Sequence, residues 1–208
     1  MSDDEKEVAF STLSPDGVSE IWLAEIDRST PPRRIAQKAN AVFFAGSGLI
    51  FLSLEDKQNF IERIGKDGNG RRRVLDRPIL GLQGVSPDGK WVTAGVSGRD
   101  ESAPVELVVS VETGGSRVIC GRCLSFWGPN GKWMYAVRGA LGSQESRVSI
   151  QLGATQEPPL RLSALVLEAV PPGTTLIPHR FFAPGPNPST YAFVRRDMQR
   201  NLYRIPLR

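Results

Sequence analysis

The sequence feature that most constrains the fold of this chain is a pattern that returns at a nearly constant spacing. In each copy an apolar run leads into a turn that contains glycine, and a second apolar run follows; the copies cover 41–52, 84–94 and 124–137. Their turn centres are Ser47, Asp88 and Asn130, which lie 41 and then 42 residues apart. Repeats of about 40–45 residues are typical of a unit of four short strands that packs against copies of itself.

The turns of the last two copies explain why each copy begins as a hairpin. They read Pro87-Asp88-Gly89 and Pro129-Asn130-Gly131. Proline fixes φ at the first turn position, Asp or Asn bonds its own backbone, and glycine accepts a positive φ. We therefore predict a tight connection between two antiparallel strands in each repeat.

Two further strand patterns follow each hairpin, so the chain divides into blades, a term used here for one such antiparallel sheet. We predict three complete four-stranded blades at 41–75, 82–120 and 124–162, the last ending in a strand at 160–162 and followed by a long connection, 163–177. The ends are incomplete. Residues 7–36 supply the second to fourth strands of a blade, with the turn at 14–17 between its second and third strands, and 178–206 supply the first three strands of another.

The predicted fold class is therefore all-β, a partial or small β-propeller of about five blades in a single domain, 1–208. Scattered turn formers, 21 Gly and 16 Pro, agree with many short strands. Because both ends stop inside a blade, we expect an open fragment of a larger ring rather than a five-bladed ring that lacks two strands. Exposed strand edges would also favour an edge-mediated homodimer.

Charge and composition narrow the classes of partner. The net charge is +4, and the arginines recur in small groups such as 71–73 and 195–196 rather than on one stripe, so we expect no nucleic-acid partner. No apolar window is long enough to cross a membrane, and the polar start Met1–Glu7 is not a signal peptide. The compartment stays open; it would be periplasmic or extracytoplasmic if a parent protein were exported or membrane-anchored.

Several of these motifs resemble a known family. Ser86-Pro87-Asp88-Gly89-Lys90-Trp91 resembles the PD40 repeat of TolB-like, WD40-like β-propellers, with weaker echoes at 128–133 and 14–22. The closing stretch, 191–203, resembles the C-terminal propellers of bacterial eukaryotic-like Ser/Thr kinases. The resemblance implies a binding or sensing role and offers no catalytic residues to carry over. The chain departs from the repeat at 45–48 and 184–187, which argues against perfect ring symmetry.

The sharpest motif for chemistry is Cys120-Gly121-Arg122-Cys123. A CxxC pair is either redox-active, half of a zinc site, or structural. Zinc needs four ligands, and the only other candidate is the single histidine, His179, so we expect structural thiols, with a disulfide as the main alternative and a metal as the least favoured one. We predict no cofactor.

Other candidate sites are weaker. His179 is the only base for a serine triad, and no G-x-S-x-G elbow surrounds Ser47. The segment 66–70 has too few acids for a calcium loop and is predicted to be a turn. The acidic pairs 55–56 and 100–101 are expected to be solvated loop residues, although carboxylates from different blades could meet.

The four tryptophans, at 22, 91, 127 and 133, are expected to pack between blades, with ligand stacking as the alternative. The predicted function is thus a non-catalytic β-propeller module. It binds a protein or small ligand on its face or through loops 97–104 and 139–145, and it forms the C-terminal part of a larger multidomain bacterial protein such as a sensor kinase. The alternative is the gating propeller of a serine oligopeptidase or a polysaccharide-active enzyme.

Overall fold

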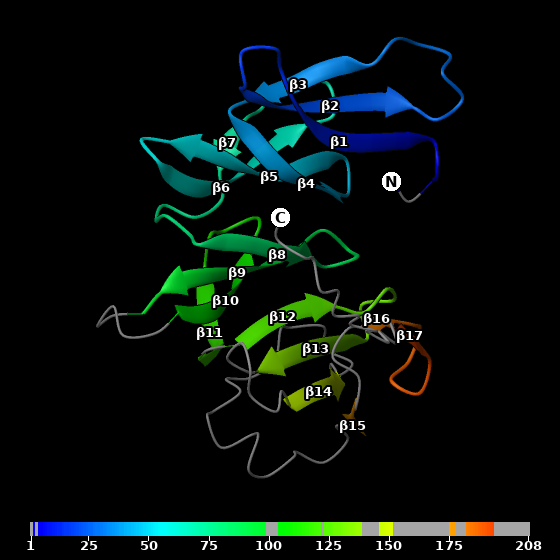
Figure 1. Ribbon diagram of the computed structural model, residues 1–208, viewed down its shortest axis with the longest axis vertical. Helices are drawn as coiled ribbons and strands as arrows, with labels where there is room; N and C mark the ends of the chain where they lie inside the picture. The colour runs from blue at the N-terminus through cyan, green and yellow to red at the C-terminus, as the bar shows by residue number, and fades with distance from the viewer. Residues whose placement is uncertain are drawn as a thin grey trace, which may run out of the picture.

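The computed structural model describes residues 2, 4–98, 104–121, 123–138, 146–151, 175–177 and 182–193. Within these ranges every regular element is a β-strand, so the all-β prediction is confirmed. The strands form five antiparallel sheets, and in each sheet neighbouring strands follow one another along the chain. Figure 1 shows the first sheet of the chain at the top and the later sheets below it.

Blade 1 has three strands: β1 (Glu7–Leu13), β2 (Ser19–Glu25) and β3 (Arg33–Gln37). Blade 2 has four: β4 (Ala39–Ala45), β5 (Gly48–Glu55), β6 (Gln58–Gly65) and β7 (Arg72–Arg73). Blade 3 has four: β8 (Gly81–Val85), β9 (Trp91–Ser97), β10 (Pro104–Ser110) and β11 (Ser116–Gly121). Blade 4 has four: β12 (Cys123–Trp127), β13 (Trp133–Arg138), β14 (Ser146–Gln151) and β15 (Thr175–Leu176). Blade 5 has two: β16 (Phe182–Pro184) and β17 (Tyr191–Phe193).

The first blade has three strands, and its connection to the next blade agrees with their interpretation as second to fourth strands. A single residue, Lys38, separates β3 from β4, just as a single position, 122, separates β11 from β12. Because β11 is the fourth strand of its blade, this shared connection indicates that β3 is a fourth strand too. The turn at 14–17 accordingly joins the second and third strands of blade 1, although its letters match the hairpin turn at 86–89.

The predicted end of blade 4 needs a correction. Its fourth strand, β15, pairs with β14 at Val148↔Leu176 and Ser149↔Thr175, inside the segment 163–177 that was predicted to be a connection. The strand predicted at 160–162 lies outside the described residues, as does the third strand predicted for blade 5 at 201–205. A two-residue strand carries too little periodicity to be recognised from sequence.

The core lies between blades rather than within them. Along β5 the side chains alternate: Leu49 and Phe51 join the cluster shared with blade 1, whereas Ile50 and Leu52 join the cluster shared with blade 3. All four are at most 8% exposed. A strand covered on both faces reads as a continuous apolar run, which is why Gly48–Leu52 shows no polar alternation. Burial of each such side chain contributes about 1.5–3 kcal/mol.

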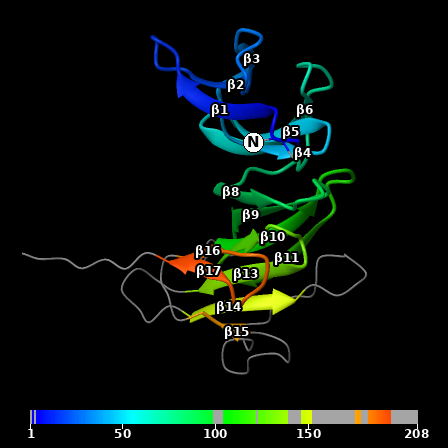
Figure 2. The same cartoon turned by 90° about the vertical axis from the view of Figure 1, so that its right-hand side faces the viewer.

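Figure 2 shows the sheets following one another down the molecule, and apolar side chains fill the later junctions as well. Val108 and Ile119 of blade 3 pack with Met134 of blade 4. Phe126 and Tyr135 of blade 4 stack at 5.6 Å between ring centroids, and Phe182 of blade 5 lies 5.6 Å from each of them. Each blade therefore covers the apolar face of its neighbour, as the repeat predicts.

Candidate functional site

The hairpins that join the first and second strands of consecutive blades pack against one another, and we call this series the hairpin ladder. Gly89 has φ +70°, and a Cβ there would lie 2.8 Å from the backbone of Ala45 and Gly46 in the hairpin before it. Gly131 in turn faces Pro87, with 3.7 Å between its ideal Cβ position and the proline ring. Glycine in these turns thus serves both the left-handed backbone and the close approach of two hairpins.

The hairpin ladder extends to blade 5. Asn130 Nδ2 donates a hydrogen bond of 2.7 Å to the carbonyl of Pro186, in the turn between β16 and β17. Within each turn the Asp or Asn side chain also accepts a backbone N–H: Asp88 Oδ1 from Lys90 at 3.1 Å, and Asn130 Oδ1 from Lys132 at 3.0 Å. The turn chemistry predicted for the repeat is therefore confirmed, and it fixes the positions of the neighbouring side chains.

A cavity of about 300 Å³ opens between the hairpins of blades 3 and 4, and we call it the hairpin groove. Its lining residues are Ser86, Pro87, Asp88, Trp91, Trp127, Asn130 and Gly131. Two half-buried indole rings thus form its apolar wall, while Asp88 and Asn130 are exposed and supply polar groups. A few oriented polar groups on an aromatic-lined wall are typical of binding sites.

One hydrogen-bond donor of a residue that lines the hairpin groove has no acceptor within the described part of the chain. Trp127 Nε1 is buried and has no hydrogen-bond acceptor among the described residues. The ring lies over Gly84, whose ideal Cβ position is 4.0 Å from Trp127 Cδ1, so no side chain on β8 intervenes. By contrast, Trp22 Nε1 in blade 1 donates to Glu20 at 3.1 Å. A buried N–H without an acceptor lowers the stability of the folded protein by about 1–3 kcal/mol, and a ligand that supplies an acceptor would recover this free energy.

Asp88 gives the hairpin groove an acidic group whose negative charge is only weakly neutralised by a neighbouring cation. Asp88 Oδ1 accepts from Ser86 Oγ at 2.6 Å, and Asp88 Oδ2 lies 4.0 Å from Lys90 Nζ. Both Asp88 and Lys90 are exposed, so this ion pair is weak. The carboxylate therefore stays available to a cation at the mouth of the hairpin groove.

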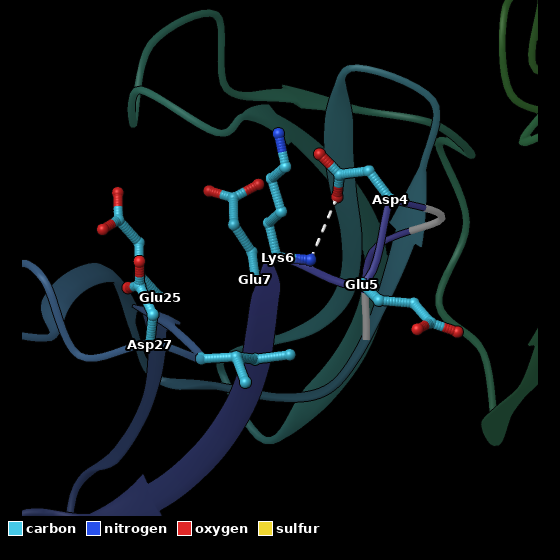
Figure 3. Close-up of a pocket in the computed structure, with 7 residues that line it drawn as sticks. Asp4, Glu5, Lys6, Glu7, Glu25 and Asp27 are labelled. Atoms are coloured by element: carbon cyan, nitrogen blue, oxygen red, sulfur yellow. Dashed lines mark hydrogen bonds between the residues drawn. The ribbon is translucent and has the colours of Figure 1, made fainter.

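A second cavity, of about 500 Å³, lies beside the start of β1 (Figure 3). Its lining residues are Asp4, Glu5, Lys6, Glu7, Glu25, Ile26 and Asp27. The carboxylates are partly paired already, because Glu7 accepts from Lys66 Nζ at 2.6 Å. Hydrogen bonds from Ser2 and the Lys6 backbone lower the pKa of Asp4, and those from Ser29 lower that of Asp27. No group of three or more His, Cys, Asp or Glu suited to a metal ion occurs among the described residues.

The tryptophans lie where the repeat predicts, and two of them come together at the groove. Trp91 and Trp133 begin the second strands of blades 3 and 4, in equivalent places. Trp91 and Trp127 pack against the apolar cluster between these blades, as expected, and they also line the hairpin groove. For these two, packing and exposure to a ligand are compatible because each ring is only half buried.

The remaining sequence candidates are scattered. Ser47 lies in the β4–β5 turn, and 66–70 form the β6–β7 turn, as predicted. Glu55 is the last residue of β5 rather than a loop residue, and it pairs with Arg73 at 2.6 Å on the surface. His179, the acids 100–101, most of loop 97–104 and all of loop 139–145 lie outside the described residues. Cys120 and Cys123 are joined by a disulfide, which was the alternative to structural thiols.

Sequence reasoning overlooked three buried glutamates, Glu20, Glu62 and Glu106, which are at most 5% exposed. Glu20 pairs with Arg34 at 2.7 Å, and Glu62 pairs with Arg71 and accepts from Ser53 at 2.8 Å. Burial raises the pKa of Glu62, but the bonds from Arg71 and Ser53 outweigh this effect and lower it overall. The available signal was an acid inside an apolar strand pattern, as in Val105-Glu106-Leu107.

Glu106 differs from the other two because no cation pairs with it among the described residues. Its Oε1 accepts from Ser125 Oγ at 3.0 Å and from the Ser125 backbone at 3.4 Å, across the junction with blade 4. Its Oε2 is buried and has no hydrogen-bond partner among the described residues. Burial raises the pKa of Glu106 from 4.5 to about 7.

Solved structures with the same arrangement were found at low sequence identity. TolB from Acinetobacter baumannii is 15% identical with a TM-score of 0.58, over 74% of this chain and 41% of that one. A protein described as a TolB from Agrobacterium tumefaciens is 17% identical with a TM-score of 0.57, over 73% of this chain and 60% of that one. The β-propeller domain of the Trilobed protease from Pyrococcus furiosus is 12% identical with a TM-score of 0.54, over 72% of this chain and 52% of that one.

These likenesses show the fold, a β-propeller of TolB-like type. The chain spans less than two thirds of the length of each of the three. No protein-family model matches the sequence, and no curated protein matches it. In the part of the chain that the structure describes, no helix could cross a membrane.

Proposed function

We propose that this chain is a non-catalytic β-propeller module that binds an extended segment of a protein partner in the hairpin groove. The observation that carries the proposal is the aromatic wall of the hairpin groove, in which Trp127 also has a buried Nε1–H without an acceptor among the described residues. A backbone carbonyl of a bound peptide would supply that acceptor. The rings of Trp91 and Trp127 would hold an apolar or proline side chain.

The size and charge of the groove narrow the ligand further. A volume of about 300 Å³ is at the lower end of the range for ligand pockets, and it suits one anchoring side chain of a peptide. Asp88 at the mouth favours a lysine or arginine next to that anchor, and a cation beside two indole rings gains additional attraction. The proposed ligand is therefore a short segment with one apolar anchor and one neighbouring basic residue.

The test uses a displayed library of random peptides, selected on the immobilised full chain and then titrated by tryptophan fluorescence. Trp127→Phe keeps an aromatic ring but removes the N–H, so it should weaken selected peptides about fivefold to tenfold. Asp88→Asn should weaken only the basic peptides. The matched control is Trp22→Phe, because Trp22 lies in blade 1 and its Nε1 already bonds Glu20. Selection of no consensus, or equal affinity of Trp127→Phe and wild type, would refute the proposal.

We further propose that the module belongs to a larger multidomain protein. The support is the resemblance of 191–203 to propellers carried C-terminally on bacterial Ser/Thr kinases. The neighbouring reading frame tests this directly. A kinase domain upstream in the same frame supports a sensor role, with the groove as its input surface.

The second candidate function is the gating propeller of a protease or another hydrolase. It is supported by the likeness to the propeller domain of the Trilobed protease. In that case the catalytic residues would lie on another domain, and the propeller would only control access. A hydrolase domain in the same reading frame, together with failure of peptide selection on the groove, would favour this candidate over the first.

A further inference from the structure

A further cavity adjoins the hairpin groove on blade 3, and we call it the arginine pocket. Its volume is about 400 Å³, and its lining residues include Trp91, Val108, Ser110, Thr113, Ser116 and Arg117. Trp91 lines the hairpin groove as well, so one indole ring forms a wall of both cavities. A ligand that rests on this ring can therefore reach from one cavity into the other.

The order of the strands explains why the two cavities are neighbours. The turn at 86–90 leads into β9 and the turn at 111–115 follows β10, so the antiparallel pairing of β9 with β10 places both turns at one end of blade 3. A backbone hydrogen bond joins the two turns, because the Val111 N–H donates to the Lys90 carbonyl at 2.9 Å. Both cavities thus lie at the same end of the blade.

The side chains of the arginine pocket come from three neighbouring strands and share one face of the sheet. Trp91 of β9 is the register partner of Ser110 of β10. Val108 of β10 is the register partner of Arg117 of β11. Directly opposite residues lie on one face, and so do residues two positions apart along a strand. Because Val108 packs with Met134, this face is turned toward blade 4, as the hairpin groove is.

Arg117 gives the arginine pocket a positive charge that no described residue neutralises. Its side chain is exposed and forms no ion pair in the described part of the chain. The nearest acid along the chain is Glu112, and it is not among the described residues that line the pocket. A guanidinium presents a planar fork of N–H donors that matches the two oxygens of a carboxylate.

Hydroxyl groups supply further donors in the arginine pocket. Ser110 Oγ accepts from the Thr113 backbone N–H at 3.3 Å, and Thr113 Oγ1 accepts from the Gly115 N–H at 3.2 Å. Since a hydroxyl has one donor in addition to its acceptor lone pairs, both groups can still donate to a ligand. The pocket therefore favours an anion, whereas Asp88 at the mouth of the hairpin groove favours a cation.

We propose that the arginine pocket is a second subsite for the peptide of the hairpin groove and binds a carboxylate side chain of that peptide. This inference rests on the proposed function, because the peptide must first be anchored between Trp91 and Trp127. The ligand then has a basic residue beside its apolar anchor, near Asp88, and an acidic residue on the other side of the anchor, at Arg117. Two opposite charges at the two ends fix the direction of the peptide across the cavities.

The strand geometry sets the spacing between the anchor and the acidic residue. Arg117 lies two strands away from Trp91 in the sheet, which is about 10 Å at about 4.8 Å per strand. Its register is level with Thr93, two residues farther along β9, which adds about 7 Å at right angles. Together these displacements make about 12 Å, and an extended peptide covers that distance in about three or four residues.

The test takes the peptides selected on the immobilised full chain and compares each with a version in which its acidic residue is glutamine. Wild type should bind the acidic version about threefold to tenfold more tightly, and about 0.5 M salt should reduce this preference. Arg117→Gln should bind the two versions equally, whereas Arg117→Lys should keep part of the preference. The matched control is Arg33→Gln, because Arg33 is an exposed arginine in the fourth strand of blade 1 and lines none of the three cavities described.

These measurements separate the subsite from the proposed function. Trp127→Phe should weaken both peptide versions, because it acts on the anchor. Peptides that depend on Trp127 but carry no acidic residue about three or four positions from the anchor overturn the subsite alone. An equal loss for both versions in Arg117→Gln also overturns it, since a merely structural effect would give that result. Selection of no consensus overturns both the subsite and the proposed function.

Discussion

Replacement of Glu106 by glutamine should change the stability of the folded protein in a direction that depends on pH. Glutamine has nearly the same shape and keeps an oxygen that can accept from Ser125, but it cannot ionise. In the wild type Glu106 is 1% exposed, with one carboxyl oxygen bonded to Ser125 and the other without a partner among the described residues. The variant therefore isolates the cost of a buried charge.

The magnitude follows from the raised pKa. Burial moves the pKa of Glu106 from 4.5 to about 7, and a tenfold change in proton affinity corresponds to about 1.4 kcal/mol. Below the unfolded value of 4.5 both states are protonated and there is no penalty. Between 4.5 and about 7 the unfolded chain releases its proton first, so the stability of the wild type falls as pH rises. Above about pH 7 the accumulated loss is about 3 kcal/mol.

Relative to wild type, Glu106→Gln should be less stable at the low end of this pH range and more stable at the high end. Its amide group gains no acceptor, which costs about 1 kcal/mol at every pH. Glu106→Gln should thus be about 1 kcal/mol less stable than wild type near pH 4 and about 2 kcal/mol more stable near pH 8. For a chain of 208 residues a difference of about 3 kcal/mol corresponds to roughly 6–12 °C in Tm.

Guanidinium unfolding at several pH values, followed by the fluorescence of the four tryptophans with the disulfide oxidised, measures this difference directly. The comparison with wild type at each pH removes the contributions of all other titrating groups. Glu62→Gln is the control of opposite sign, because the pKa of Glu62 is lowered and its partners stabilise the ionised form. A free-energy difference for Glu106→Gln that stays constant from pH 4 to pH 8 would contradict the reasoning.

Three further predictions concern the stack of blades. Gly89→Ala should lower the free energy of unfolding by more than about 2 kcal/mol, because the new Cβ would lie 2.8 Å from the backbone of the preceding hairpin. Gly17→Ala has a similar φ of +78° but open space, so it should lower it by only about 1 kcal/mol. Equal losses in urea unfolding would contradict the stacked hairpins. Ile61→Ala, at a site with 0% exposure between blades 2 and 3, should cost about 2–5 kcal/mol by the same measurement. Arg71→Met should destabilise the protein by about 1–3 kcal/mol at pH 7 and progressively less below pH 4.5, because protonation of Glu62 removes the unpaired buried charge; a loss that persists at low pH would exclude this explanation.

The hairpins and the order of the blades could be predicted from the sequence because they depend on local chemistry. Pro87-Asp88-Gly89 and Pro129-Asn130-Gly131 determine their turns within a few residues, and the continuous apolar run along β5 is typical of a strand covered on both faces. The strand β15 could not be predicted, because two residues carry no period and their position depends on pairing with β14, at Val148↔Leu176 and Ser149↔Thr175.

The candidate sites depend on contacts between blades, and the sequence of one repeat does not show which residues of the next blade it will contact. The sequence predicts that Trp91 and Trp127 pack between blades. Only the stacking of two hairpins, however, creates the groove and leaves Trp127 Nε1 without an acceptor among the described residues. The letters Cys120 and Cys123 likewise left thiols, disulfide and metal open until the structure joined the two sulfur atoms.

By itself the sequence determined what each blade is: its turns, its strand periods and its length, since backbone preferences and apolar alternation act over a few residues. Only the tertiary structure decided what meets at the blade junctions. Desolvation and hydrogen-bond pairing depend on which side chains a neighbouring sheet brings close. Glu106 is therefore an ordinary acid in the sequence, whereas in the fold it is buried and only one of its oxygens is bonded among the described residues.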